Sequence, residues 1–226
     1  MLTKTQKRFS IIYAIVLIVE LICGSTNDLA KLHYFTKPII VLSLLVFFIT
    51  QSKSSNKTTK TLMILALILS LIGDVALLFD SINPIYFIIG LASFLLAHVM
   101  YTLLFLKQRD ENKTPIRFII LMLLYACGLF YLLRNGLGEL LIPVIIYMIV
   151  ILSMSTSAFL RIKENNLNSY NWVFIGAILF MISDSILAID KFYQSFTFSS
   201  IGIMLTYAIA QYCIVIGILK WNLNSR

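Results

Sequence analysis

Two aspartates, Asp74 and Asp184, stand inside stretches that are apolar enough to cross a membrane. A carboxylate at that depth is costly, and it usually faces a protein interior or a wet cavity where it has a function. Each is followed six residues later by another aspartate, Asp80 or Asp190, so this pattern takes four of the 10 acidic residues. We therefore expect Asp74 and Asp184 to be catalytic groups. The alternative is that each only bonds a neighbouring helix.

A few polar side chains in the same apolar stretches are candidates to complete a site. His98 lies near the middle of its stretch and shares a helix face with Tyr101, three residues later. Either His98 takes part in catalysis by orienting the reacting groups, or it only bonds another helix. Ser183 directly precedes the second intramembrane aspartate, and Tyr207 and Gln211 lie four residues apart. These side chains are candidates for substrate binding.

Two charged residues near the expected outer ends of helices extend the set of candidates. Lys37-Pro38 is expected to begin a helix, a position that suits proline. The Lys37 ammonium either binds a phosphate or neutralises a carboxylate. Glu20 either lines the same cavity as the aspartates or reaches toward the lipid headgroups. Both residues are therefore candidates for substrate binding.

No spacing in the chain is typical of a metal site or of a serine nucleophile. His-x3-His and His-x2-Glu are both absent, and His33 is expected in a loop. No Gly-x-Ser-x-Gly sequence surrounds Ser183. The three cysteines are isolated in apolar stretches and are interpreted as buried, inert thiols: Cys23, Cys127 and Cys213. We expect neither a metal nor a cofactor.

The composition indicates that these residues belong to a helical membrane protein. The chain has 226 residues, 60% hydrophobic and 12% charged, with a mean hydropathy of +0.94. The net charge of +8 comes from basic residues in alternate loops, which indicates membrane topology rather than nucleic acid binding. We predict an all-α, single integral membrane domain over residues 1–226. Its eight transmembrane helices are expected at about 9–23, 34–50, 61–79, 85–106, 118–133, 140–160, 172–189 and 201–219.

The basic residues also predict how the chain is oriented. Of the 18 Lys and Arg residues, 14 fall at the termini and in the loops that share their side, and four fall on the other side. The positive-inside rule then places both termini in the cytoplasm. The bias toward Lys, Asn and Ile is typical of an AT-rich bacterium, so we expect a bacterial cytoplasmic membrane. Residues 69–80 align with 179–190, which suggests a 4+4 parallel repeat, although short apolar segments also align by chance.

The ordered set of motifs resembles the YhhN family of membrane proteins, which is lysoplasmalogenase-like. The matching residues are Lys37-Pro38, Gly73-Asp74, Phe87, Gly90, Phe94, His98, Tyr101, Gly176-Ala177, Phe180, Ser183-Asp184, Tyr207 and Gln211. The resemblance implies an eight-helix protein that hydrolyses the vinyl ether bond of lysoplasmalogens. The products would be a fatty aldehyde and glycerophosphoethanolamine or glycerophosphocholine. The implied partners are a lysophospholipid substrate and membrane lipids.

The candidate residues suit that chemistry. Vinyl ether hydrolysis begins with protonation of a carbon, and water then attacks the resulting oxocarbenium ion. A pair of carboxyl groups in different surroundings can supply both the acid and the carboxylate that stabilises the cation and activates water. Asp74 and Asp184 fit these roles in either order. His98 and Tyr101 would orient groups or relay protons, and Lys37 would hold the phosphate.

Two other hypotheses stay open at this stage. Paired intramembrane aspartates also serve as proton sites in transporters, so a proton-coupled carrier of a small molecule or lipid is the alternative function. A non-catalytic membrane protein with structural aspartates is the third possibility. Substituting Asn for either aspartate would abolish turnover in an enzyme, whereas it would only lower the melting temperature of a structural protein.

Overall fold

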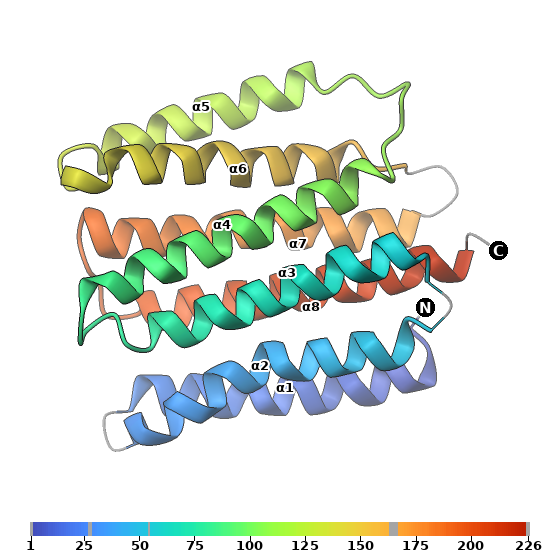
Figure 1. Ribbon diagram of the computed structural model, residues 1–226, viewed down its shortest axis with the longest axis horizontal. Coiled ribbons are helices and arrows are strands. Elements are labelled where there is room, and N and C mark those ends of the chain that lie inside the picture. Colours follow the sequence, from blue (N-terminus) through green and yellow to red (C-terminus); the bar gives the residue numbers. More distant parts are fainter. Residues whose placement is uncertain (1, 27–28, 54, 163–166, 225–226) are drawn as a thin grey trace.

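Eight long helices make up the described part of the protein (Figure 1). The computed structural model describes residues 2–26, 29–53, 55–162 and 167–224. The helices are α1 (Lys4–Ser25), α2 (Ala30–Gln51), α3 (Lys57–Leu77), α4 (Pro84–Leu106), α5 (Ile116–Leu133), α6 (Leu141–Phe159), α7 (Leu167–Phe192) and α8 (Ser199–Asn224), with a short 3-10 turn η2 (Gly138–Leu140) before α6. Within the described residues, eight helices are long and apolar enough to span a membrane. The predicted all-α class and the eight apolar helices are therefore confirmed.

Several helices extend beyond the boundaries predicted from hydropathy. α1 begins at Lys4 rather than at residue 9 because Thr3 caps it. The Thr3 hydroxyl accepts a hydrogen bond from the Gln6 backbone N–H at 3.2 Å, and the Gln6 side chain accepts one from the Thr3 backbone N–H at 3.0 Å. α7 begins at Leu167, ahead of the predicted residue 172. Hydropathy marks the part of a helix that lies in hydrocarbon, so polar first turns are missed.

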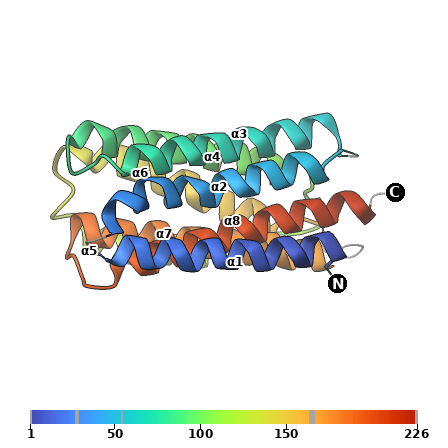
Figure 2. The ribbon, with the colours of Figure 1, turned by 90° about the horizontal axis from the view of Figure 1, so that it is seen from below.

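The prediction that Lys37-Pro38 begins a helix was wrong. α2 begins at Ala30, and Pro38 lies inside it. Proline is tolerated within membrane helices because other groups satisfy the freed backbone carbonyl, and α2 bends near its N-terminal end (Figure 2). This longer helix also contains His33, which was expected in a loop. Both His33 and Lys37 are therefore held on the same rigid element.

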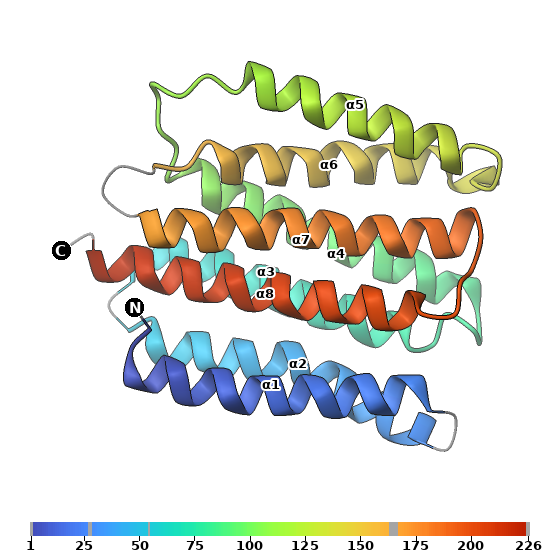
Figure 3. The ribbon, with the colours of Figure 1, turned by 180° about the vertical axis from the view of Figure 1, so that it is seen from behind.

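The helices are arranged in antiparallel pairs. α3 contacts α4 extensively and α7 contacts α8 extensively, and α4 also packs on α6. α1, α8 and α7 lie on one side of the bundle, with α3 and α4 behind them in Figure 3. Both termini lie at the same end (Figure 2), as an even number of antiparallel spans requires.

α5 is the least enclosed helix and lies at the edge of the bundle, beside α6 (Figure 1). Of its side chains only Met122 and Leu133 are buried, whereas Leu123 and Leu124 are 55% and 67% exposed. Cys127 is also exposed, which corrects the expectation that all three cysteines are buried. An apolar helix with an open face of this kind fits contact with lipid.

Arg161 ties together the loops at the end of the bundle where the termini lie. Its side chain is fully buried and donates to Gln108 Oε1 at 2.8 Å, to the Ser169 carbonyl at 3.2 Å and to Ser169 Oγ at 2.9 Å. Its guanidinium also lies 5.5 Å from the centre of the Trp221 ring. Burial lowers the pKa of Arg161 to about 9, so the group stays positively charged at neutral pH and keeps these bonds.

Candidate active site

A polar cavity inside the bundle brings together residues from α1, α2, α3, α7 and α8. It encloses about 870 Å³, part of which opens to the outside. The candidate residues that line it are Glu20, Lys37, Asp74, Ser183, Asp184 and Tyr207. The two intramembrane aspartates thus face one cavity, although they lie on helices far apart in the sequence.

Asp74 occupies the buried side of this cavity. It is 2% exposed, and Tyr207 of α8 donates a hydrogen bond of 2.8 Å to its Oδ2 atom. Gly73, next to Asp74, allows Phe94 of α4 to approach α3, because a Cβ atom at this position would lie 2.6 Å from the Phe94 ring. The small residue next to the carboxylate therefore lets α4 pack closely against α3.

The other predicted residues near Asp74 form a hydrogen-bonded chain behind it. Tyr101 donates to Gln211 Oε1 at 2.6 Å. The Gln211 amide Nε2 donates to Ser70 Oγ at 2.9 Å and lies 3.4 Å from the Tyr207 hydroxyl. Tyr101 and Gln211 are fully buried and do not line the cavity. Both residues were predicted to contact the substrate. In the structure they instead hold the wall of the site in place.

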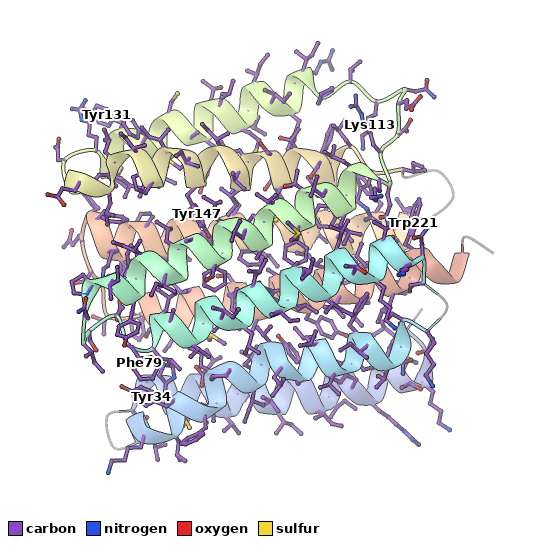
Figure 4. All side chains as sticks on the ribbon, in the orientation of Figure 1. Tyr34, Phe79, Lys113, Tyr131, Tyr147 and Trp221 are labelled. Carbon is purple, nitrogen blue, oxygen red and sulfur yellow. The ribbon has the colours of Figure 1, made fainter. Side chains whose placement is uncertain are left out.

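Asp184 is held by two side chains from other helices. Tyr147 of α6 donates a hydrogen bond of 2.5 Å to Asp184 Oδ2. His98 Nε2 of α4 lies 2.9 Å from the same oxygen and 2.9 Å from the Tyr147 hydroxyl. Figure 4 shows Tyr147 in the interior of the bundle, between α6 and α4. His98 therefore orients Asp184 from behind the cavity.

Tyr147 was missed by the sequence analysis. Its depth in the span could have identified it, because Tyr147 lies six residues inside α6. Tyrosines in membrane proteins are enriched at the water interfaces, where the hydroxyl stays wet. A tyrosine deeper in a span needs a hydrogen-bond partner in the protein, and an intramembrane carboxylate is a suitable one.

Ser183 lines the cavity, but its hydroxyl already has a partner. It donates to the Ile203 carbonyl of α8 at 2.9 Å, so it fixes α7 against α8 next to Asp184.

The outer aspartates of the doubled pattern, Asp80 and Asp190, differ from each other. Asp80 lines the cavity and pairs with Lys191 at 3.1 Å, whereas Asp190 does not line it.

Charged residues of α1 and α2 form another wall of the cavity. Glu20 is 1% exposed, accepts a hydrogen bond from Thr36, and lies 2.9 Å from His33 Nδ1. Lys37 is half-buried in the same wall and attracts the Asp74 carboxylate electrostatically. Within the described residues, no group of three potential ligands suitable for a metal is present. The wall therefore presents the Lys37 ammonium to the cavity, whereas the His33 imidazole lies against Glu20.

Comparisons with known proteins identify one family and several relatives that share one enzyme name. Residues 32–218 match the profile of the YhhN family. The chain is 29% identical to the human lysoplasmalogenase TMEM86B over 197 residues, which are 86% of this chain and 78% of that protein. It is 29% identical to a lysoplasmalogenase of Mycobacterium tuberculosis over 136 residues, 58% of this chain and 50% of that protein. It is 29% identical to lysoplasmalogenase TMEM86A of Bos taurus over 162 residues, 70% and 65% of the two chains. No solved structure matches.

Proposed function

The chain belongs to the YhhN family, and we propose that it hydrolyses the vinyl ether bond of lysoplasmalogens to a fatty aldehyde and glycerophosphoethanolamine or glycerophosphocholine. The observation that carries this proposal is the pair Asp74 and Asp184, which line one polar cavity in an otherwise apolar bundle. Relatives named lysoplasmalogenase support the reaction type. These relatives carry enzyme names, so the proton-coupled carrier is not proposed.

The reaction consumes one water molecule and uses a proton only as a catalyst. One aspartic acid donates its proton to the vinyl carbon that carries the hydrocarbon chain, and the neighbouring carbon becomes an oxocarbenium ion. The other aspartate accepts a proton from water as the water oxygen bonds to this cation. The hemiacetal formed in this way then breaks its bond to the glycerol oxygen, which takes the proton held by the second carboxyl group, while the hemiacetal hydroxyl gives its proton to the first; the aldehyde leaves and both groups are restored. Asp74 and Asp184 lie on the same cavity, as this sequence requires.

The surrounding residues have supporting roles in this proposal. His98 and Tyr147 hold the Asp184 carboxyl group through its Oδ2 atom. The other oxygen, Oδ1, has no hydrogen bond from a described residue, which leaves it for the substrate. Lys37 is the cavity's ammonium group and is proposed to bind the substrate phosphate.

We also propose that both termini lie in the cytoplasm, with the chain in a bacterial cytoplasmic membrane. The excess of basic residues on the side of the termini supports this orientation. α3 pairs with α4 as α7 pairs with α8, which supports the 4+4 parallel repeat. Labelling single cysteines introduced into the loops with a membrane-impermeant reagent tests the orientation, and labelling of the 107–115 loop from the outside would reverse it.

The decisive experiment measures aldehyde release by the purified protein from a lysoplasmalogen, with an ester lysophospholipid in parallel. We expect aldehyde from the vinyl ether alone, and none from the variants Asp74→Asn and Asp184→Asn. Asp190→Asn is the matched control on α7, because that residue does not line the cavity. Each variant must also melt cooperatively near the wild-type temperature. A folded wild-type protein that releases no aldehyde would refute the proposal, and turnover by either Asn variant would remove that aspartate from the mechanism.

A further inference from the structure

A second cavity, which we call the apolar chamber, lies between α4, α5, α6 and α7. It comprises about 710 Å³ of space, part of which is open to the outside, and it is lined mainly by aliphatic and aromatic side chains, among them Phe87, Leu91, Leu129, Val144, Ile151 and Phe192. The chamber is therefore an apolar recess that is partly open at the surface of the bundle.

The polar groups in the wall of the chamber are already paired. Tyr125 of α5 and Ser185 of α7 share a hydrogen bond, and Ser185 also donates to the Met181 carbonyl at 2.7 Å. The Tyr147 hydroxyl is bonded to Asp184. Nothing in the wall besides this aspartate thus offers a free polar group to a ligand, so the chamber suits a hydrocarbon.

Asp184 stands where the two cavities meet. It lines both the polar cavity and the apolar chamber, together with Leu77, Phe94 and Leu187. One carboxyl group therefore has a charged, polar compartment on one side and an apolar compartment on the other.

We infer that the apolar chamber binds the hydrocarbon chain of the lipid whose headgroup occupies the polar cavity. This inference rests on the proposed function. A lysoplasmalogen carries its phosphate on one side of the vinyl ether and its hydrocarbon chain on the other, so its polar and apolar parts meet at the bond that is cleaved. With the phosphate near Lys37 and the chain in the chamber, that bond lies beside Asp184.

This placement divides the catalytic roles between the two aspartates. The vinyl carbon that gains the proton is the one that carries the chain, so it lies on the chamber side of the reacting bond. Asp184 lines the chamber and Asp74 does not. Asp184 is thus the proton donor to carbon. Asp74 takes the proton of the attacking water from the polar side.

The test fills the chamber and measures chain-length preference. Ala126 of α5 and Ala188 of α7 line the chamber, so Ala126→Phe and Ala188→Phe should exclude part of a long chain. Each methylene that no longer fits costs about fourfold in affinity. We expect kcat/KM for a hexadecenyl lysoplasmalogen to fall at least about tenfold relative to an octenyl one. Cys127→Phe is the matched control, because Cys127 follows Ala126 on the exposed face of α5.

A binding measurement separates failure of this inference from failure of the proposed function. The probe is a lysophospholipid with a saturated hexadecyl ether, which has no vinyl bond to cleave. It should raise the melting temperature of the wild type and of Cys127→Phe, and it should do so much less for Ala188→Phe. If the wild type releases no aldehyde from a lysoplasmalogen of any chain length, the proposed function fails. The melting-temperature shift caused by the hexadecyl ether still tests whether the chamber binds a hydrocarbon chain.

An unchanged chain-length preference together with an unchanged melting shift in both Phe variants would overturn the inference. If a Phe variant does not fold, Ala126→Val and Ala188→Val replace it. The smaller side chain should change the preference in the same direction and by a smaller factor, and no change in these variants would equally overturn the inference.

Discussion

Replacing Tyr147 by Phe removes one hydroxyl from the group that holds Asp184. That hydroxyl donates to Asp184 Oδ2 at 2.5 Å and lies 2.9 Å from His98 Nε2. The ring itself is 9% exposed and would keep its packing in the variant. The substitution therefore tests the positioning of the carboxyl group with little change in the shape of the protein.

The size of the effect follows from the type of hydrogen bond that is lost. Asp184 becomes ionised as it gives its proton to carbon, and a hydrogen bond to an ionised group is worth about 1.5–3 kcal/mol. At about 1.4 kcal/mol for each factor of ten, kcat should fall by about 10- to 150-fold. KM should change much less, because the hydroxyl is bonded to the catalytic group and not to the substrate phosphate.

The assay measures kcat and KM for aldehyde release by Tyr147→Phe and by a control, Tyr13→Phe. Tyr13 is also buried and donates to the Ala208 carbonyl at 2.8 Å, away from both cavities. Tyr13→Phe loses a buried hydrogen bond between neutral groups, which costs about 1 kcal/mol of stability, and it should keep its kcat within about twofold because that bond does not hold either aspartate. A Tyr147→Phe protein that melts normally and loses less than about threefold in kcat would refute the positioning role.

Three further predictions concern the reaction, the substrate and the fold. In D2O each aldehyde should carry one deuterium on the carbon next to the carbonyl, as seen by mass spectrometry. Aldehyde without deuterium would exclude protonation of carbon by a group that exchanges with solvent. Lys37→Gln should raise KM about tenfold with little change in kcat, because a charged contact to the phosphate is lost, and an unchanged KM would place the phosphate elsewhere. Arg161→Ala should lower the melting temperature without changing KM, because each buried acceptor left unpaired destabilises the folded state by about 1–3 kcal/mol. A normal melting curve for this variant would mean that Gln108 and Ser169 find other partners.

Much of the fold could be predicted from the sequence because a bilayer imposes simple rules. A span needs about 20 apolar residues with its backbone hydrogen bonds satisfied within the helix, so hydropathy gave the number of helices. The start of α2 was missed for the same reason. Its first turns contain Lys31 and His33, which lower the local hydropathy, and Pro38 has the sequence signature of a helix start although it lies within the helix.

The site was only partly predictable, because its long-range contacts do not follow from local patterns. The cost of a buried charge singled out Asp74 and Asp184, and the structure places both on one cavity. Tyr101 and Gln211 were predicted to bind substrate, yet they bond to each other behind the wall. Helix spacing shows which side chains share a face, but it does not show which neighbouring helix that face meets. Tyr147 went unnoticed for that reason.

The hydrogen bonds around Gln211 affect how each aspartate can exchange protons. Because Gln211 Oε1 accepts from Tyr101, its amide nitrogen must act as the donor to Ser70. An amide of this kind does not take up and release protons, so the chain of hydroxyl groups is interrupted there and cannot act as a proton wire. Asp74 is thus insulated from the protein interior and must exchange protons with water in the cavity. Asp184 is bounded on its inner side in a similar way, because His98 Nδ1 is buried and has no hydrogen-bond partner among the described residues, so the imidazole leads no proton further inward. Both carboxyl groups therefore exchange protons through the water of the cavity that they share.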